Sequence, residues 1–354
     1  MNKILVLLLS ISMLLILLSG CGNFKENSTT NESTSSTTDE QNQPIEPSPA
    51  SDFEYQINPA QTGILINKYI GSSEHVIIPS YIDDLPVLSL RGVADAQVPT
   101  AIAEGAFEKT EIQTVVIPDT IKVIGYKCFK DCQSLRSVAI ASNSQLTFIS
   151  GCAFENCAKI DKIDLSSTQV KEIGAVAFRG CTSLKNIVFS STLEKIGEDC
   201  FYECLSLLEV DFPESLTDIN GGAFAYCTSL KKITIPTKLN LICLHEPIFY
   251  NVPNIEQIVF KEGRESIIGY ALILTDASLE IIVPSSIKNI SPLPFTFDPH
   301  AQIIFTFLGD APAIVEDRDE SWLYNTIIHY NPETTGWESF AWKNKCEMQP
   351  VKQN

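Results

Sequence analysis

The chain has 354 residues, with 25 lysines and arginines against 43 aspartates and glutamates, and a formal net charge of −18. Nucleic-acid binding needs a basic face that replaces counterions, so this charge balance argues against a DNA- or RNA-binding protein. It argues equally against adsorption to anionic lipid through charge. The acidic balance bears on solubility and non-specific binding, and it leaves the fold open.

Residues 1–20 have the pattern of an export signal. Lys3 precedes an apolar run from Ile4 to Leu18, which is too short to span a bilayer comfortably. The positions Leu18-Ser19-Gly20-Cys21 resemble a bacterial lipobox, which implies cleavage before Cys21 and a diacylglycerol on its sulfur. An ordinary secretory signal with a chance cysteine is the alternative. The resemblance predicts a mature, extracytoplasmic chain whose only membrane contact is a lipid anchor at Cys21.

Residues 21–52 are predicted to form a tether. From Asn23 to Asp52 the chain consists mainly of Ser, Thr, Asn, Gln and Glu, with prolines at positions 44, 47 and 49. This composition has too little apolar surface to offset the entropy of ordering, so we expect disorder. A coil of about thirty residues would hold the following domain about 30 Å from the membrane on average. That distance favours display on the cell surface.

A nine-residue phrase, here called the Phe box, recurs about every 24 residues in the predicted repeat region, residues 101–308, and is lost in its last coils. It reads Ile, three residues, a small residue and Phe, with Cys usually three positions later, as in Ile173-Gly-Ala-Val-Ala177-Phe178-Arg-Gly-Cys181. Its phenylalanines are Phe107, Phe129, Phe154, Phe178, Phe201, Phe224 and Phe249. Each unit is too small to bury its own apolar face and must stack on its neighbours, so the period predicts a solenoid.

A shorter phrase with alternating apolar positions follows each box. Examples are Leu184-Lys-Asn-Ile187-Val-Phe189 and Leu230-Lys-Lys-Ile233-Thr-Ile235-Pro236. Such alternation, closed by a proline that cannot donate to a ladder, predicts a short strand in each coil and a long parallel sheet. The pattern continues at residues 281–284 and 303–305, so the solenoid is expected to pass residue 300. A solenoid grows by adding coils, so this length requires no second domain.

Together the two phrases resemble the repeats of the BspA-like leucine-rich repeat proteins of bacterial surfaces. The resemblance covers about residues 53–345. Residues 53–100 look like the N-terminal cap of that family, and residues 309–354 look like its C-terminal cap and tail. It implies a leucine-rich-repeat solenoid of α/β-type repeats, with one short parallel strand per coil, a curved parallel sheet and capped ends. Two boxes depart from the pattern: the first has Thr110 in place of Cys and is one residue short, and the seventh, Ile248-Phe249 followed by Val252, has lost both the Ala and the Cys.

The eleven cysteines would suit disulfides or a metal site, but the aligned repeats favour a packing role. One slot per coil is filled by Cys132, Cys157, Cys181, Cys204 and Cys227. Elsewhere this slot holds Thr110 or Val252, so it is a small interior position, where a free thiol packs as a small hydrophobe. Disulfides are the alternative, because equivalent Cα atoms of neighbouring coils would lie about 5 Å apart and oxidation is permitted outside the cytosol.

No pattern of catalytic or metal-binding residues stands out. The four histidines are scattered without metal-ligand spacing, and no nucleophile elbow or phosphate loop is present. Carboxylate pairs such as Asp161/Asp164 and Glu209/Asp211 have the chemistry of a glycosidase. On these strands, however, they occupy the polar positions of a pattern in which polar and apolar residues alternate. The sequence therefore predicts no enzyme, no metal and no cofactor other than the lipid on Cys21. A tethered hydrolase is the remote alternative.

All three tryptophans, Trp322, Trp337 and Trp342, lie near the C-terminus. Aromatic clusters can stack on sugars, but a solenoid also needs an apolar cover over its last coil, and that role is favoured here.

The outward face of the strands is the predicted ligand-binding surface. Every second side chain of a parallel sheet lies on one continuous face, which suits recognition of an extracellular protein or polysaccharide. The candidates are Arg136, Asp161, Lys162, Asp164, Lys185, Asn186, Glu209, Asp211, Lys231, Lys232, Thr234 and Glu256. They are mixed in sign and include no Tyr or Trp, which often anchor interfaces. We therefore expect a surface-anchored binding or adhesion module, with a structural spacer or envelope component without a ligand as the alternative.

Overall fold

The computed structural model describes residues 46–91, 104–239, 247–267, 272–274, 278–290, 295–297, 302–315 and 325–351. The chain divides into two compact units, residues 1–48 and 49–354, and the second carries almost all of the described structure. The expected signal, Cys21 and most of the expected tether lie outside the described residues. Within the described ranges, no helix has the length and apolar character needed to cross a membrane.

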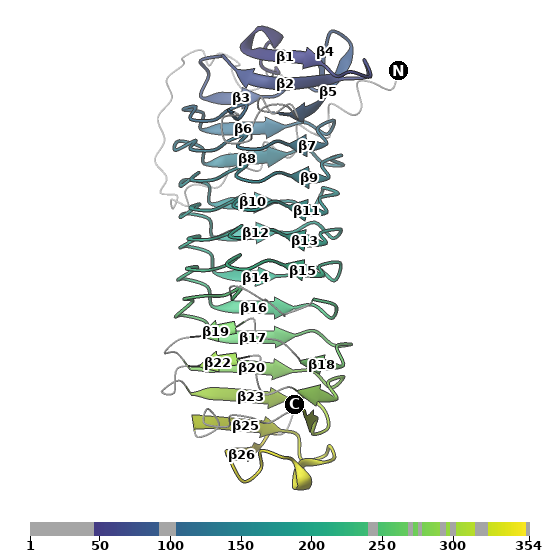
Figure 1. The fold of residues 1–354 in the computed structure, drawn as a ribbon, viewed down its shortest axis with the longest axis vertical. Coiled ribbons are helices and arrows are strands. Elements are labelled where there is room, and N and C mark those ends of the chain that lie inside the picture. The colour runs from purple at the N-terminus through teal and green to yellow at the C-terminus, as the bar shows by residue number, and fades with distance from the viewer. Residues whose placement is uncertain are drawn as a thin grey trace, which may run out of the picture. The chain divides into compact units, whose positions relative to one another are not determined.

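Residues 49–354 form a parallel β-solenoid, which confirms the predicted fold class (Figure 1). One strand of each coil lies on a first side of the solenoid. These strands are β3 (His75–Ile77), β6 (Thr114–Ile117), β8 (Ser137–Ile140), β10 (Lys162–Asp164), β12 (Asn186–Val188), β14 (Glu209–Asp211), β16 (Lys232–Ile235), β17 (Gln257–Phe260), β20 (Leu279–Val283), β23 (Ile303–Phe307), β25 (Thr326–Tyr330) and β26 (Glu347–Pro350). We call them the first ladder.

The coils differ from the expected repeat in two details. Most described coils carry a second short strand, and the described residues contain no α-helix, only the 3₁₀ turns η1 (Ala50–Asp52) and η3 (Trp337–Ser339). The strands of this second ladder are β5 (Leu85–Leu90), β7 (Val123–Ile124), β9 (Phe148–Ile149), β11 (Glu172–Ile173), β13 (Lys195–Ile196), β15 (Asp218–Ile219), β18 (Ser266–Ile267), β21 (Asn289–Ile290) and β24 (Ala313–Ile314). Most are two residues long and coincide with the start of a Phe box, so the sequence pattern conceals them.

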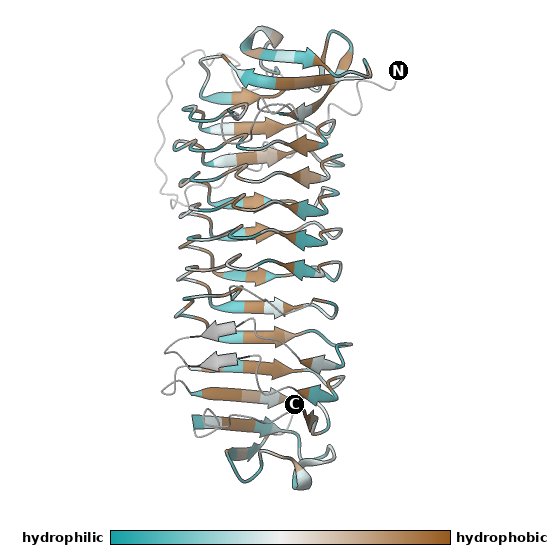
Figure 2. Cartoon of the chain, in the orientation of Figure 1, coloured by the Kyte–Doolittle hydropathy of each residue, from teal (hydrophilic) through white to brown (hydrophobic). Residues whose placement is uncertain are grey.

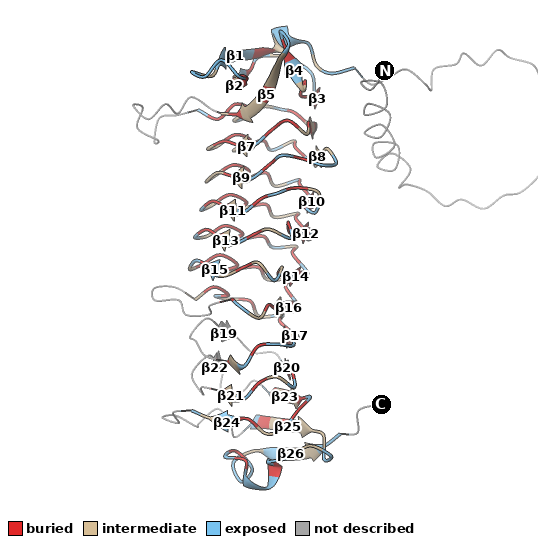
Figure 3. Cartoon of the chain, turned by 90° about the vertical axis from the view of Figure 1, so that its right-hand side faces the viewer, coloured by how far each residue is buried: buried red, intermediate tan, exposed pale blue. Residues whose placement is uncertain are grey.

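A continuous column of phenylalanine rings fills the interior. The seven box phenylalanines are all buried, and their rings stack at centroid distances from 4.9 to 5.4 Å. Phe178 lies nearly parallel to Phe154 and Phe201, at interplanar angles of 5° and 2°. Figures 2 and 3 show the same arrangement, with apolar and buried segments recurring at equivalent places in successive coils.

The box cysteines form a second interior column beside the phenylalanines. Each thiol donates a hydrogen bond to the carbonyl oxygen of the box phenylalanine one coil earlier, at Sγ–O distances from 2.9 to 3.3 Å. In the first box the Thr110 hydroxyl donates to the Phe107 carbonyl at 2.8 Å, which explains why threonine fits this slot. The nine described cysteines are free thiols, and the five of this column are buried.

The two ends of the solenoid are closed differently. At the N-terminal end, β1 (Phe53–Ile57) pairs antiparallel with β2 (Ile64–Tyr69), and β4 (Tyr81–Ile82) pairs antiparallel with β5. At the other end, the first ladder continues through β25 and β26, beyond residue 308. Trp337 and Trp342 are buried and pack against Phe307 and Phe305, at 5.2 and 5.6 Å, so both serve the cap. Trp322 lies outside the described residues.

The first ladder is interrupted where the second is not. Its strands form three separate sheets, β3-β6-β8, β10-β12, and the run from β14 to β26. The second ladder pairs without a break from β5 to β15, across the same coils. Hydrogen bonding between coils is therefore uneven around the solenoid, and the interruption between β12 and β14 lies at the candidate site.

Candidate binding groove

The twelve predicted sheet-face residues all lie on or beside strands of the first ladder. Their burial confirms the alternation: the flanking Ile163, Ile187, Val210 and Ile233 are buried, whereas the candidates are exposed or half-buried. The parallel register places equivalent positions of neighbouring strands side by side, for example Lys162 beside Asn186 and Glu209 beside Lys232.

Half of these candidates line a single groove of about 770 Å³ on the outward face. They are Lys162, Asn186, Glu209, Asp211, Lys232 and Thr234. The lining is completed by Ser166, Ile187, Val188, Phe189, Ser191, Val210, Phe212, Pro213 and Lys261. The other six candidates, Arg136, Asp161, Asp164, Lys185, Lys231 and Glu256, lie outside it.

The groove lies over the interruption between β12 and β14. Ile187 and Phe189 are buried but slightly more accessible, at 8% and 7%, than Ile163 and Leu165 one coil earlier, at 1%. Val188, on the outward side of β12, is 40% exposed. The groove therefore combines an apolar floor with a rim of charged, hydroxyl and amide side chains, which is the usual character of a ligand site.

Lys261 crosses one coil to reach the rim of the groove. Its ammonium lies 2.9 Å from Asp211 Oδ1 and 3.9 Å from Glu214 Oε1, and it donates a hydrogen bond to the Phe212 carbonyl at 2.8 Å. These contacts hold one wall of the groove in place. Lysine spacing along the strands gives no indication that Lys261 would reach Asp211, so sequence reasoning missed it.

The remaining rim charges differ in how they are paired. Lys162 lies 3.1 Å from Asp164, and partial burial of Asp164 is outweighed by hydrogen bonds from Ser166 and by this ammonium, so the pKa of Asp164 is lowered. Lys232 and Glu209 have no ion-pair partner among the described side chains. Both are exposed, so their charges are available to a ligand. Outside the groove, Lys231 instead pairs with Glu256 at 2.7 Å.

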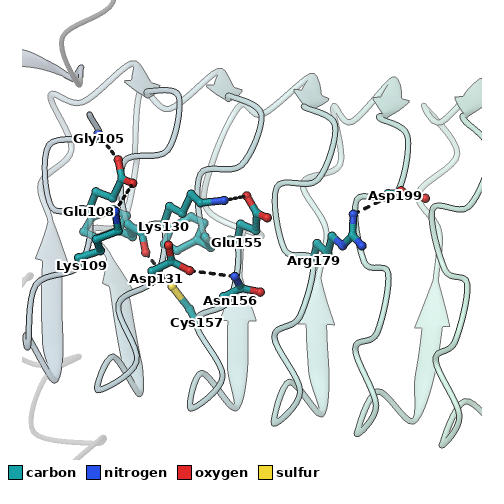
Figure 4. A network of polar contacts seen from close by, with 12 residues as sticks. Gly105, Glu108, Lys109, Lys130, Asp131, Glu155, Asn156, Cys157, Arg179 and Asp199 are labelled. Atoms are coloured by element: carbon teal, nitrogen blue, oxygen red, sulfur yellow. Dashed lines mark hydrogen bonds and ion pairs between the residues drawn. The ribbon is translucent and has the colours of Figure 1, made fainter. Parts of the chain in front are cut away.

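The turns of the Phe boxes carry a second array of polar and aromatic side chains. Figure 4 shows the ion pair of Lys130 with Glu155 and the contact of Arg179 with Asp199, which measures 3.9 Å. Arg179 also lies over the ring of Tyr202, at 4.6 Å from its centroid.

Tyr202 begins a short row of tyrosines on these turns. Its ring lies 5.0 Å from that of Tyr226, which lies 5.5 Å from that of Tyr250. Tyr250 is 44% exposed. Sequence reasoning missed the row because Tyr202 and Tyr250 directly follow the box phenylalanine, whereas Tyr226 comes one position later.

Histidine and cysteine do not gather into a ligand set in the described part of the chain. No three His, Cys, Asp or Glu side chains converge there in a geometry that could hold a metal ion. His75 contacts the Thr114 hydroxyl at 3.0 Å and His329 contacts the Gln349 amide oxygen at 3.2 Å, so each has a local polar partner. His245 and His300 lie outside the described residues.

Comparison with protein families gives one match, a model described as the BspA type leucine-rich repeat region. It matches six copies, over residues 100–228 and 171–300, which together span more than half of the chain. Comparison with curated proteins gives no match.

Several solved structures are similar to this chain. A leucine-rich repeat protein of T. pallidum is 28% identical over 61% of this chain and 86% of its own, with a TM-score of 0.40. A leucine-rich cell surface protein of Faecalibacterium prausnitzii is 18% identical over 86% of this chain and 95% of its own, with a TM-score of 0.43. The pneumococcal vaccine antigen PcpA is 14% identical over 85% and 98%, with a TM-score of 0.35.

Proposed function

The chain belongs to the BspA-type leucine-rich repeat family, and from this membership we propose that its solenoid is an extracytoplasmic binding module for a protein or polysaccharide. Proteins of this architecture offer a continuous surface built from equivalent positions of successive coils. In this chain the proposed contact surface is the groove between β12 and β14, together with the exposed charges that border it.

One observation carries the proposal. The first ladder is interrupted between β8 and β10 and again between β12 and β14, and six sheet-face residues from four consecutive coils line a groove over the second interruption. A solenoid that only maintained a distance would gain stability by closing this ladder, because backbone groups of β12 and β14 would then be paired with each other. The open groove is better explained by a surface that receives a ligand.

Charge supports the same choice of partner class. The groove is lined by three lysines and two carboxylates, so it offers donors and acceptors to a polar ligand without the basic field that nucleic acid requires. In a chain with a net charge of −18, these lysines also give an acidic group of a partner a local place to dock.

We further propose that the chain is a lipoprotein held at the bacterial surface through a diacylglycerol on Cys21. The support is the sequence of residues 1–21, with its apolar run and the Leu-Ser-Gly-Cys motif. The polar segment to Asp52 would then separate the solenoid from the membrane. No cofactor is proposed besides this lipid.

The second candidate function is that of a spacer without a ligand. It is favoured by the charges that satisfy each other on the same face, such as Lys231 with Glu256 and Lys162 with Asp164. A dedicated contact surface would have more charged side chains without an ion-pair partner of their own, as is the case for Lys232 and Glu209 among the described residues.

The two functions are separated by a matched pair of triple variants of the full chain in detergent. The first, Lys162→Ala, Glu209→Ala and Lys232→Ala, removes rim charges of the groove. The second, Lys171→Ala, Glu194→Ala and Lys195→Ala, makes the same charge change beside the second ladder, where these side chains are also largely exposed. Binding of each to arrays of matrix proteins and glycans is compared with that of the unmodified chain.

For a binding module we expect the groove variant alone to lose its saturable targets, with at least tenfold weaker binding, because a few interface residues usually dominate affinity. Both variants should keep the melting temperature of the unmodified chain, since exposed strand positions contribute little stability. Equal loss in both variants would indicate diffuse charge attraction, and the absence of any saturable target for the unmodified chain would favour the spacer.

A further inference from the structure

The row of tyrosines on the Phe-box turns is a second surface feature, apart from the groove. Tyr202, Tyr226 and Tyr250 come from three consecutive coils, and none of them lines the groove. Tyr250 is 44% exposed and the other two are half-buried, so each side chain keeps part of its surface in contact with solvent. Their hydroxyl groups have no hydrogen-bond partner in the described part of the chain. The row therefore offers both aromatic surface and polar atoms to a ligand.

The same turns carry charged residues in earlier coils. The residue after the box phenylalanine is Lys130 in one coil and Glu155 in the next, and the two form an ion pair (Figure 4). From Tyr202 onward, aromatic side chains take the place of such pairs. The backbone of the turn does not require this change, since Asn156 and Tyr226 occupy equivalent positions with φ angles of +61° and +59°.

Polar side chains lie along the row. The guanidinium carbon of Arg179 lies 4.6 Å from the centroid of the Tyr202 ring, at one end. Glu203 directly follows Tyr202, is exposed and has no ion-pair partner among the described side chains. Asn251 directly follows Tyr250, at the other end. Guanidinium, carboxylate and amide groups are thus available to donate to, and accept from, the hydroxyl groups of a ligand.

We propose that the tyrosine row and the polar side chains beside it bind an extended polysaccharide that runs along the solenoid axis. Aromatic rings pack against the C–H groups on the faces of sugars, and phenol hydroxyls can bond to sugar hydroxyls at the same time. The ring centroid of Tyr226 lies 5.0 Å from that of Tyr202 and 5.5 Å from that of Tyr250, which is close to the length of one sugar unit in an extended chain. Successive sugars would therefore meet successive coils. This site is independent of the function proposed for the groove.

The angles between the rings indicate the shape of the chain that fits. The Tyr226 ring is inclined by 54° to that of Tyr202 and by 72° to that of Tyr250. The rings therefore form corners instead of one flat platform, and a sugar can pack its face on one ring and its edge against the next. Such a surface favours a chain whose successive sugars are rotated about its axis.

A protein segment is the alternative occupant, and exposed Leu205, in the same turn as Tyr202, would suit one. An extended peptide returns to the same face about every 6.6 Å, because its side chains alternate between two faces. Both ring spacings in the row are shorter than this repeat. The side chains of a peptide would lose register with the rings, whereas sugar units would keep it.

The test measures binding of β-1,4-linked hexasaccharides of glucose, N-acetylglucosamine, mannose and xylose to the full chain by calorimetry, in a detergent without sugar headgroups. Affinity for the bound hexasaccharide should rise with chain length up to the length of the row and change little beyond it. Tyr226→Ala, which removes the central ring, should weaken binding about tenfold, because it removes both aromatic contact and buried area. Tyr226→Phe keeps the ring and should lose less. Tyr250→Ala tests the same contact at the most exposed ring, where replacement disturbs packing least.

Tyr81→Ala, at a ring that is 60% exposed in the N-terminal cap, is the matched control and should bind like the unmodified chain. The groove variant with Lys162, Glu209 and Lys232 replaced should also bind these sugars normally. Binding of none of the hexasaccharides, unchanged binding in both tyrosine variants, or equal binding of the curved α-1,4-linked glucose hexasaccharide would overturn the proposal. A protein target that is lost on Tyr226→Ala, without any sugar bound, would overturn it in favour of a protein segment.

Discussion

The Cys181 thiol donates a hydrogen bond to the carbonyl oxygen of Phe154, one coil earlier, at a distance of 3.2 Å. The same contact recurs from Cys132 to Cys227, so one buried thiol in each of five coils bonds to the preceding turn. A disulfide would remove the donors from this column. The sulfur atoms therefore have a packing and hydrogen-bonding role that requires the reduced form.

We expect these thiols to be unreactive in the folded chain and to react on unfolding. Thiol titration before and after denaturation should show few reactive groups in the native chain and about ten in the denatured one, because burial excludes the reagent and suppresses the thiolate. Loss of stability on adding a reducing agent would contradict this expectation and reveal disulfides instead.

The same burial predicts a loss of stability at alkaline pH. Burial raises the pKa of Cys181 and of Cys227 from 9.0 to about 12. Above pH 9 the unfolded chain loses these protons while the folded chain keeps them, so the free energy of unfolding falls as pH rises from about 9 toward 12. Urea denaturation at several pH values should show a shallower decline in a Cys181→Ala, Cys227→Ala variant than in the unmodified chain.

Replacing Phe178 with Ala should cost roughly 3–5 kcal/mol of local stability, because a fully buried aromatic ring is removed from a continuous stack. Coils interact mainly with their neighbours, so hydrogen exchange should increase around residues 155–212 and little elsewhere. Tyr250→Ala, at an exposed ring, is the control. Unchanged exchange in the Phe178 variant would show that the stack contributes little.

Val176 occupies a backbone conformation that is unfavourable for a β-branched residue. Its φ is +62°, and the equivalent positions in other coils are Lys127, Cys152, Asp199 and Gly222. Asparagine tolerates this region far better, so Val176→Asn should raise the free energy of unfolding by about 1 kcal/mol. Chemical denaturation measures the change.

Gly180 provides the opposite test at a position with a φ of +71°. A Cβ there would lie 2.6 Å from Asn156 Oδ1, so Gly180→Ala should destabilise the chain. If Val176→Asn and Gly180→Ala shifted stability in the same direction, backbone conformation would not be the cause.

Cys21→Ala should release the protein from the membrane, because the lipid on this residue is the only anchor proposed. In detergent phase partitioning, the unmodified chain should enter the detergent phase and the variant the aqueous phase. Cys346→Ala, which changes a half-buried cysteine of the cap, should partition like the unmodified chain. A Cys21 variant that stayed with detergent would contradict lipidation.

Much of the fold follows from the spacing of residues such as Phe178 and Ile187, because a repeated burial pattern has few structural solutions. The second ladder could not be predicted in this way. A strand as short as Glu172–Ile173 has no alternation of its own, and its pairing with Lys195–Ile196 depends on how adjacent coils stack. The turn geometry was equally hidden, since Val176 gives no sign of its positive φ.

The candidate site was predictable in its face but not in its location. Asn186 and Glu209 belong to the outward columns because of their place in the repeat. Nothing in the strand residues 186–188 and 209–211 predicts the interruption between them, since each strand pairs normally on its other side, with β10 and with β16. The interruption depends on how whole coils pack, so it is visible only in the strand pairing of the folded chain.

The uneven pairing of the two ladders has a mechanical consequence. Force applied along the coil axis would be shared between both ladders in most described coils, but between β8 and β10 and between β12 and β14 it passes mainly through the Phe boxes and the second ladder, which at the latter step is the pairing of β13 with β15. Extension should therefore begin as a one-sided bend that widens the groove, with Ile196 and Ile219 near the pivot. For a chain held at a surface and bound to a partner, as proposed above, tension would change the shape of the surface that makes the contact.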